Sequence, residues 1–507
     1  MAATRRKKLV LAVIDAMSPA MLHETVAAGR APTLAELIKR GAHVDNCVSA
    51  FPSVTPICAA SITTGQRQDR HGIAAMNWYH RGQGRYVEYG TSFRASQAVG
   101  FKRSLTDTIY NMNAEHLSRD VHTVFESLDD DDLRTAATTF LIYRGRHVQQ
   151  PADDTALTRL AATVFRHPVN GPRELFYADL FASQRTSCRS QFGLPYSRDP
   201  HAGCVGAHLV EQDLFDFLLL SLPDNDSHSH RQGPAGQIDS IPVADAAIGR
   251  VMDAGGGIDA FLEDHAVIVC SDHAQTLVTD PIDLFAAFDG FNFQPATNPR
   301  RGKPGIPDLA VCPNSRAAQI YALGNRRRAA VDGYERVLRE TPGVELTMRL
   351  TDHPDGEVAI RRQDGELRFS PGGKLVDLQG RRWSVEGDLD VLELSFDGDQ
   401  VASAAYPDAF GRVWAALRCR TAGDVFASAA SGHEFVDWGG SHHVGGGSHG
   451  SLHSDDSNAS LLWCGTGPES AEARPQWLIS DIAELVRGHF GLPSRLSFAP
   501  PGASSSD

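Results

Sequence analysis

The chain has 507 residues, of which 42% are hydrophobic and 22% charged, and its formal net charge is −14. This length exceeds what one hydrophobic core usually supports, so we expect one large α/β domain with insertions, or two domains. The composition is that of a globular protein and excludes a fibrous or disordered chain. The acidic balance argues against binding of nucleic acid duplexes, because their backbone phosphates would be repelled.

The first predicted element is a buried strand at residues 8–15. The basic residues before it resemble the start of a secretory signal, but the apolar stretch is short and is interrupted by Asp15. Other apolar runs also fall short of the roughly 20 residues that a membrane helix needs, so we expect no membrane partner. The eight cysteines are scattered and form no CxxC pair. This pattern favours a reducing, cytoplasmic setting.

Four apolar, β-branched runs end in Asp or polar residues, as buried parallel strands do where their carboxyl ends open on a site. They are residues 8–15, 135–143, 215–226 and 265–272. Helical stretches at 32–41 and 56–65 intervene, so the sequence predicts a doubly wound α/β core with a mostly parallel sheet. Charged, alternating segments at 357–369 and 374–396 instead indicate antiparallel hairpins.

We therefore predict a core that is interrupted twice. The predicted parts are core at 1–145, an insertion at 146–204, core at 205–292, an inserted mixed α+β cap at 293–438, core at 439–499 and a disordered tail at 500–507.

A proline-rich turn at Phe51–Pro56 leads into the predicted helix that ends at Gly65. Pro56 suits the first helical position, which makes Thr55 the expected N-cap. A helix N-terminus offers unpaired N–H groups and partial positive charge, so a hydroxyl there lies where a phosphate is stabilised. Thr55 is therefore either a nucleophile or simply a cap.

Three later segments carry candidate metal ligands. Asp272 and His273 follow a predicted strand, where carboxylate and imidazole can hold one zinc ion. An N-cap Asp beside a surface His is the alternative. The other two segments hold the remaining candidates: Asp224, Asp226, His228 and His230 after the run that ends at Leu222, and His449 in a glycine-rich loop, with His442, His443 and His453 nearby.

In chain order these motifs resemble those of nucleotide pyrophosphatases and phosphodiesterases of the alkaline phosphatase superfamily. The resemblance covers residues 1–145, 205–290 and 439–490. It rests on Asp15, Phe51-Pro52 before Thr55, Thr64-Gly65 with His71-Gly72-Ile73, Asp226 and His230 before Gly233-Pro234, Ser271-Asp272-His273, and Ser448-His449-Gly450.

The resemblance implies a metal-dependent hydrolase of phosphodiester or pyrophosphate bonds that works through a covalent phospho-threonine at Thr55. The substrate would be a small phosphorylated molecule, and a nucleotide is one candidate. Three carboxylates against two dications would leave a net positive pocket that suits a phosphate. Two divalent ions, expected to be zinc, would be held by Asp15, Thr55, Asp272 and His273 on one side and by Asp226, His230 and His449 on the other.

The sequence departs from the family in three places, one of which is Ala274, where the family has a glycine after the Asp272-His273 pair. Asp224 with His228 has the same spacing as Asp226 with His230, so the register of this pair stays open. The family's Asn that holds a phosphate oxygen aligns with Met76, which makes its neighbour Asn77 the candidate.

Other substrate contacts are also candidates. Trp78 and Tyr79 could stack on a base or aryl group, although such residues more often belong to a core. Arg144 and Arg146 could contact a second phosphate or lie in a solvated loop.

Three other functions stay open from the sequence. They are a phosphonoacetate-type C–P hydrolase, a phosphomonoesterase of the same superfamily, and a zinc-binding protein that has lost turnover. The oligomeric state is open as well.

Overall fold

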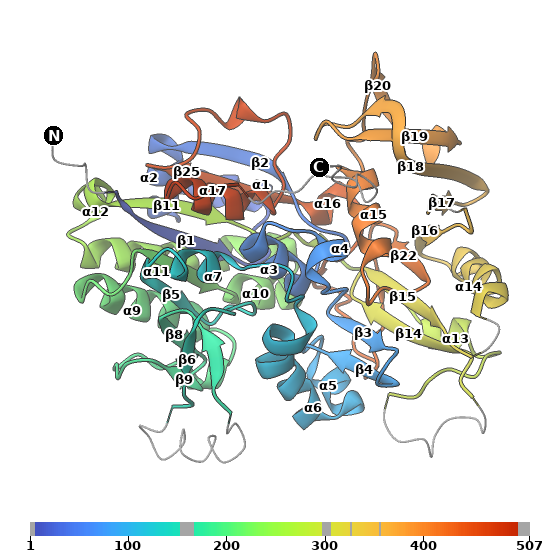
Figure 1. Ribbon diagram of the computed structural model, residues 1–507, viewed down its shortest axis with the longest axis horizontal. Helices are drawn as coiled ribbons and strands as arrows, with labels where there is room; N and C mark the ends of the chain where they lie inside the picture. The colour runs from blue at the N-terminus through green and yellow to red at the C-terminus, as the bar shows by residue number, and fades with distance from the viewer. Residues whose placement is uncertain (1–5, 153–166, 297–305, 325–326, 354–355, 495–507) are drawn as a thin grey trace, which may run out of the picture.

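The computed structural model describes residues 6–152, 167–296, 306–324, 327–353 and 356–494 (Figure 1). The predicted tail at 500–507 lies outside them. The core is an eight-stranded sheet with the order β2-β25-β11-β1-β10-β5-β8-β9. Its strands are β1 (Lys8–Ile14), β2 (Ala42–Val48), β5 (Thr135–Thr138), β8 (Glu174–Tyr177), β9 (Phe181–Ala182), β10 (Phe217–Leu222), β11 (His265–Cys270) and β25 (Asn458–Cys464).

The strand directions confirm the predicted, mostly parallel sheet. Strands β11, β1, β10, β5 and β8 run parallel to one another. Strand β25 is antiparallel to β11, and β2 is antiparallel to β25, so β2 again runs in the direction of β1. The carboxyl ends of β1, β2, β10 and β11 therefore open on the same edge of the sheet, where ligands bind in this class of fold.

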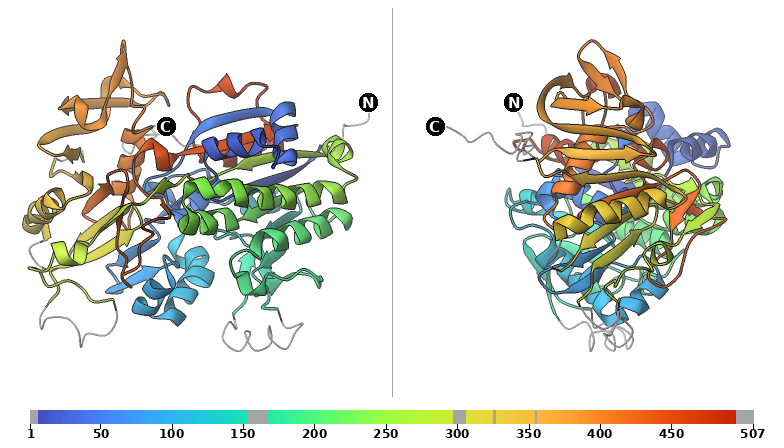
Figure 2. Two further views of the ribbon diagram at one scale, coloured as in Figure 1. Left: turned by 180° about the vertical axis from the view of Figure 1, so that it is seen from behind. Right: turned by 90° about the vertical axis from the view of Figure 1, so that its right-hand side faces the viewer.

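Helices cover both faces of the sheet because successive side chains of each strand point to opposite sides. In β1, Leu9 and Leu11 pack with α3 (Thr55–Thr64), α7 (Val124–Asp129) and α17 (Asp481–His489). Val10 and Ala12 pack on the opposite face. Figure 2 shows the two long helices of that face, α9 and α11, side by side. The helices there are α1 (Pro19–Ala27), α2 (Pro32–Arg40), α9 (Arg198–Glu211), α11 (Gln237–Ala254) and α12 (Ile258–Asp264).

A second sheet of nine strands lies beside the core, within the segment predicted to form the cap (Figure 1). The predicted hairpins are confirmed, because β17 pairs antiparallel with β18, and β18 with β19. Helices α14 (Arg327–Glu340) and α15 (Ala409–Arg418) pack in separate cores on this sheet. Its strands are β14 (Leu309–Asn314), β15 (Ala317–Ala322), β16 (Val344–Leu350), β17 (Val358–Arg362), β18 (Gly365–Val376), β19 (Arg382–Gly387), β20 (Ser395–Asp397), β21 (Gln400–Ala402) and β22 (Val425–Ala429).

The segment 146–204, predicted to be an insertion, contributes two strands to the core. Strand β8 pairs parallel with β5, and β9 pairs antiparallel with β8 at the edge of the central sheet. The core sheet thus extends beyond the boundary at 145. Among the described residues, no helix combines the length and apolarity that crossing a membrane requires.

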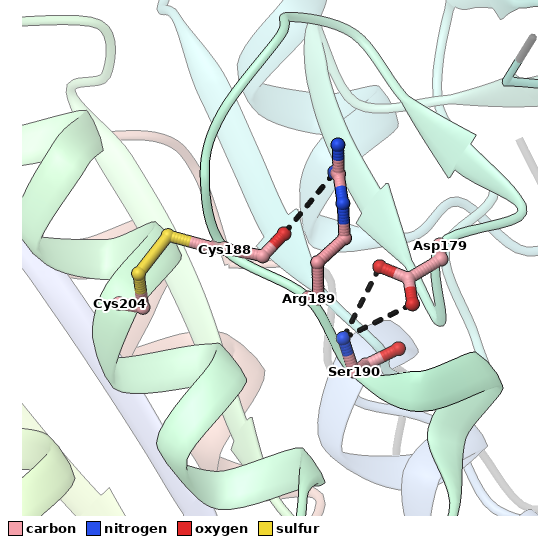
Figure 3. Close-up of a disulfide and its surroundings, with 5 residues drawn as sticks. All are labelled: Asp179, Cys188, Arg189, Ser190 and Cys204. Atoms are coloured by element: carbon pink, nitrogen blue, oxygen red, sulfur yellow. Dashed lines mark hydrogen bonds between the residues drawn. A yellow bond between two sulfur atoms is a disulfide. The ribbon is translucent and has the colours of Figure 1, made fainter. Parts of the chain in front are cut away.

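A disulfide joins Cys188, in the loop after β9, to Cys204 in α9 (Figure 3). The other six cysteines are free and buried. The pair has a sequence separation of 16 and no local motif, so only the fold of the loop against α9 brings the two sulfur atoms together. The cytoplasmic location stays a prediction.

Replacement of both Cys188 and Cys204 by Ser should lower the free energy of unfolding by about 2–4 kcal/mol, because the bond restricts the unfolded chain. Urea titrations of the oxidised protein, the reduced protein and the double variant measure this. The reduced protein should match the variant, whereas Cys464→Ser should keep the difference between oxidised and reduced forms. Equal stability of the oxidised protein and the double variant would contradict the prediction.

Candidate active site and metal centre

The strand ends deliver most of the predicted site residues to one place. Asp15 directly follows β1, and Asp272 and His273 follow β11. Candidate ligand atoms of these three residues lie within 4.8 Å of one another. The same holds for Asp226, His273 and His449. His273 therefore belongs to both groups and lies between them.

Thr55 lies at the centre of this arrangement. Its Oγ1 is 3.3 Å from His273 Nε2, which is 3.4 Å from Asp272 Oδ2 and 3.6 Å from Asp15 Oδ1. The predicted N-cap role is wrong: α3 begins at Thr55, Val54 is the N-cap, and no side chain makes a capping bond. The Thr55 hydroxyl therefore makes no capping hydrogen bond and faces His273. Gly65 ends the helix in the left-handed conformation, as predicted.

The residues brought together here, which we call the cluster, are Asp15, Thr55, Asp226, His230, Asp272, His273 and His449. Its three histidines are oriented in the same way. His230 Nδ1 lies 2.7 Å from Gly447 O, His273 Nδ1 lies 3.1 Å from Ala274 O, and His449 Nδ1 lies 2.7 Å from Ser53 O. A backbone carbonyl accepts from a protonated Nδ1, which leaves Nε2 with its lone pair facing the pocket. Metal-binding histidines are held in this way in proteins.

The carboxylates also fit cation binding. Ala16 N and His273 N both donate to Asp272 Oδ1, whereas Asp272 Oδ2 is buried without a hydrogen-bond partner. Asp15 Oδ1 is buried and unpartnered too. Burial, together with the charges of Asp272 and Asp226, raises the pKa of Asp15 well above its ordinary value. Burial also raises the pKa of Asp272 to about 6. A cation beside these oxygens would lower both pKa values and stabilise the ionised carboxylates.

Asp226 forms the other half of the cluster. Its Oδ1 is 3.3 Å from His230 Nε2 and 3.7 Å from His449 Nε2, and Gln275 Nε2 donates to it at 2.6 Å. Burial alone would raise the pKa of Asp226, but His230 and the other imidazoles outweigh it and lower that pKa. Both halves thus combine carboxylate oxygen with imidazole nitrogen, which are zinc donors.

The helix that follows β10 shows which of the two candidate Asp–His pairs faces the cluster. Residues 224–232 form α10 (Asp224–Gln232), in which positions two apart differ by roughly 200° around the axis. Asp226 and His230 therefore face the cluster together, and Asp224 and His228 face elsewhere. Asp224 accepts from Tyr196 N at 2.8 Å and from Arg198 Nε at 2.7 Å, and the His228 ring lies against Tyr196.

The cluster opens into a cavity of about 440 Å³, which we call the active-site cavity. The side chains of Arg198 and His443 line it, although the sequence did not single out Arg198 and left His443 among several histidines. His443 stacks on His230, and Glu434 Oε1 lies 2.7 Å from His443 Nδ1. Much of the wall is apolar or aromatic: Tyr89, Leu105, Ile109, Phe140, Leu141 and Tyr177.

The predicted substrate contacts Asn77, Trp78 and Tyr79 do not line the active-site cavity. Asn77 Nδ2 donates to Glu88 Oε2 at 2.6 Å, and all three side chains are buried away from the active-site cavity. They form β3 (Asn77–His80), whose aromatic side chains belong to the main hydrophobic core. Met76, which aligns with the family's Asn, lines the cavity instead.

Arg144 and Arg146 do not reach the cluster either. Both pair with Glu126, and Arg146 also pairs with Asp130. They line a separate cavity of about 530 Å³. Neither arginine lines the active-site cavity, and the Arg144 side chain is 13% exposed, so Arg144 does not lie in a solvated loop.

A hydroxyl at a helix N-terminus, three carboxylates and three similarly oriented imidazoles thus lie at the carboxyl edge of a doubly wound sheet, the fold of the alkaline phosphatase superfamily. Residues 9–379 match the type I phosphodiesterase / nucleotide pyrophosphatase family. The chain belongs to this family and is a hydrolase of phosphoric ester bonds. Enzymes of the superfamily depend on divalent metal ions, typically two.

Solved structures show the same fold. Phosphonoacetate hydrolase from Sinorhizobium meliloti 1021, in complex with phosphonoformate, is 16% identical, with a TM-score of 0.55 and 96% of each chain covered. Murine ectonucleotide pyrophosphatase / phosphodiesterase 5 is 13% identical, with the same TM-score and coverage. Its human counterpart is 12% identical, with a TM-score of 0.54 and 96% of each chain covered. A search of curated proteins found no matching sequence.

Replacement of Asp272 by Asn should stabilise the metal-free protein at pH 7 by roughly 1–3 kcal/mol, because it removes a buried charge whose pKa is raised to about 6. A carboxyl with a raised folded-state pKa costs stability above that pKa. The gain should therefore shrink as the pH falls from 7 towards the ordinary value of 3.8.

Thermal unfolding of chelated protein across this pH range measures the effect. The exposed Asp397→Asn in β20 is the matched control and should change little. The Asp272 variant should also bind metal more weakly than the wild-type protein. A metal-free variant that is less stable than wild type at pH 7 would contradict the prediction.

Proposed function

We propose that this protein hydrolyses phosphodiester or pyrophosphate bonds of small, nucleotide-like substrates through a phospho-threonine formed on Thr55. The observation that carries the proposal is the position of the Thr55 hydroxyl, 3.3 Å from His273 Nε2 and free of any capping bond. A nucleophile needs such an accessible hydroxyl beside groups that can activate it.

The residues that would hold the two ions are those of the cluster. Asp15, Thr55, Asp272 and His273 suit one divalent ion, and Asp226, His230 and His449 suit the other. We choose Asp226 and His230 over Asp224 and His228 because α10 directs the first pair toward the cluster. Imidazole nitrogen and carboxylate oxygen in these numbers favour zinc. When bound, the ions would lower the pKa of the Thr55 hydroxyl and neutralise charge on the phosphate oxygens.

The chemistry of the chain itself is a double displacement. Thr55 Oγ1 attacks phosphorus and loses its proton, and the bond from phosphorus to the leaving oxygen breaks. Water then attacks the phospho-threonine, which restores the hydroxyl and releases the second product. The Thr55 N–H has no hydrogen-bond partner among the described residues. It can therefore donate to a phosphate oxygen at the start of α3.

The active-site cavity supports a substrate larger than inorganic phosphate. Its volume of about 440 Å³ and its aromatic and aliphatic wall suit a base or aryl group attached to the reacting phosphate. The murine relative has been solved as an inactive threonine-to-alanine variant in complex with AMP. This agrees with a nucleotide-like substrate and a threonine nucleophile here.

Thr55→Ala should lower kcat on the order of 10³-fold or more while the bound metal stays close to the wild-type amount. Thr55→Ser keeps a hydroxyl and should retain part of the activity. Steady-state hydrolysis of an aryl phosphodiester, elemental analysis of each variant and mass spectrometry of acid-quenched enzyme test the assignment. Wild-type turnover by Thr55→Ala would overturn it.

Chelation should abolish hydrolysis, and zinc should restore it better than magnesium, because imidazole nitrogen is a poor magnesium ligand. Activity is followed while each ion is added back to dialysed protein. The exposed residues His23 and Asp45 form, with the half-buried His43, a separate group that could bind metal. His23→Ala therefore serves as a control and should leave the restored activity unchanged. Full activity after exhaustive chelation would contradict metal dependence.

A phosphonoacetate-type hydrolase and a phosphomonoesterase are the competing assignments within the superfamily. Release of phosphate from phosphonoacetate, compared with cleavage of aryl monoesters, aryl diesters and nucleoside diphosphates, separates the three. A preference for diesters or nucleoside diphosphates supports the proposal.

A further inference from the structure

Arg198 is the one arginine or lysine among the described residues that line the active-site cavity. It is the first residue of α9, and its side chain is 19% exposed. Its Nε donates to Asp224 Oδ1 at 2.7 Å, and its Nη2 donates to Ser227 Oγ at 2.6 Å and to Pro223 O at 3.2 Å. Nη1 has no hydrogen-bond partner among the described residues, so its two N–H groups are available to a ligand.

The chain holds this guanidinium in place. Asp224 also accepts from the backbone N–H groups of Tyr196, Arg198 and Asp199, at 2.8, 3.0 and 3.1 Å. The Cys188–Cys204 disulfide links the loop before Arg198 to α9, the helix that begins with Arg198 (Figure 3). A side chain fixed before binding loses little conformational entropy when it meets a ligand, which increases its contribution to affinity.

A purely structural ion pair does not account for this geometry. Arg231, which contacts the same segment, shows what such a role looks like: it is exposed, lies over the Tyr196 ring and donates to Tyr196 Oη at 3.1 Å, outside the cavity. Arg198 instead lies on the wall of the same cavity that Asp15, Thr55 and Asp272 line. A ligand in this cavity can therefore contact both the guanidinium and the cluster.

We propose that Arg198 binds a second anionic group of the substrate, next to the phosphorus that reacts, and so sets a preference for substrates with two adjacent anionic groups. This inference rests on the proposed function. The second anion could be a phosphate, as in a nucleoside diphosphate, or a carboxylate, as in phosphonoacetate, because guanidinium pairs with both. A simple aryl phosphodiester lacks it.

The test compares three substrates for each variant: a nucleoside diphosphate, phosphonoacetate and bis(4-nitrophenyl) phosphate. Arg198→Gln should lower the ratio of kcat/KM for the dianionic substrate over the aryl diester by about 10- to 100-fold, mainly through KM, the size expected for a lost charge-assisted hydrogen bond. Arg198→Lys should restore part of the ratio. The difference should diminish as salt concentration rises.

Asp224→Asn tests the positioning role, and it should lower the same ratio less than Arg198→Gln does. Arg231→Gln removes the same charge from the same segment and should leave the ratio unchanged. All variants should keep the wild-type metal content, since neither arginine belongs to the cluster.

Each outcome of the substrate comparison has a meaning. A loss confined to the nucleoside diphosphate identifies the second anion as phosphate, and a loss confined to phosphonoacetate identifies it as carboxylate. Equal losses on all three substrates, no change in the ratio, or loss of bound metal would overturn the inference. An active Thr55→Ala enzyme would instead overturn the proposed function, so the two failures are distinguishable.

Discussion

The site depends on one electrostatic constraint: three carboxylates and three imidazoles share a small buried volume. Two of the carboxylates, Asp15 and Asp272, each leave an oxygen without a hydrogen-bond partner. Buried oxygens of this kind are costly when ionised unless a cation lies beside them. In this site the cost falls at the carboxyl edge of the parallel strands, where backbone N–H groups and helix N-termini also converge.

The second sheet contributes to this edge and is not a remote addition. The turn between β14 and β15 places Arg316 N 2.8 Å from His449 O, and Ser315 lines the active-site cavity. Gly450 has φ +120°, and a Cβ there would lie 2.8 Å from Asn314 O. Only glycine fits this close approach. The cap segment therefore helps to hold the loop that carries His449, and this contact requires the glycine at position 450.

The sequence was most informative where strand ends set the position of a side chain. Asp15, Asp272 and His273 could be placed because a buried strand directly precedes each of them. The choice between Asp226 and Asp224 required α10, since a loop would have allowed both registers and only a helix turns them to opposite faces.

Contacts between distant segments were beyond the sequence pattern. Asn77 follows the family motif by one residue, yet strand pairing turns its amide to Glu88. The Cys188–Cys204 pair depends on a loop that packs against α9, and the position of Arg198 depends on its contact with Asp224 of α10. Hydrophobic periodicity gives no indication of either contact. Thr55 was placed correctly at the start of a helix, but one position inside the predicted cap, which is the usual uncertainty of a helix boundary.

The cavity has Met76 where the family has an asparagine, so the charge of the substrate must be balanced by other groups, among which is Arg198. Three carboxylates and two divalent ions would leave one net positive charge, which balances a monoanionic diester but not a substrate with a second anionic group. Met76 supplies neither charge nor a strong hydrogen-bond donor at the cavity wall. Asp224 shares its charge among three backbone N–H groups at the start of α9 as well as the guanidinium. The positive helix terminus and Arg198 together can therefore offset the additional negative charge, in a way that the seven cluster residues alone cannot.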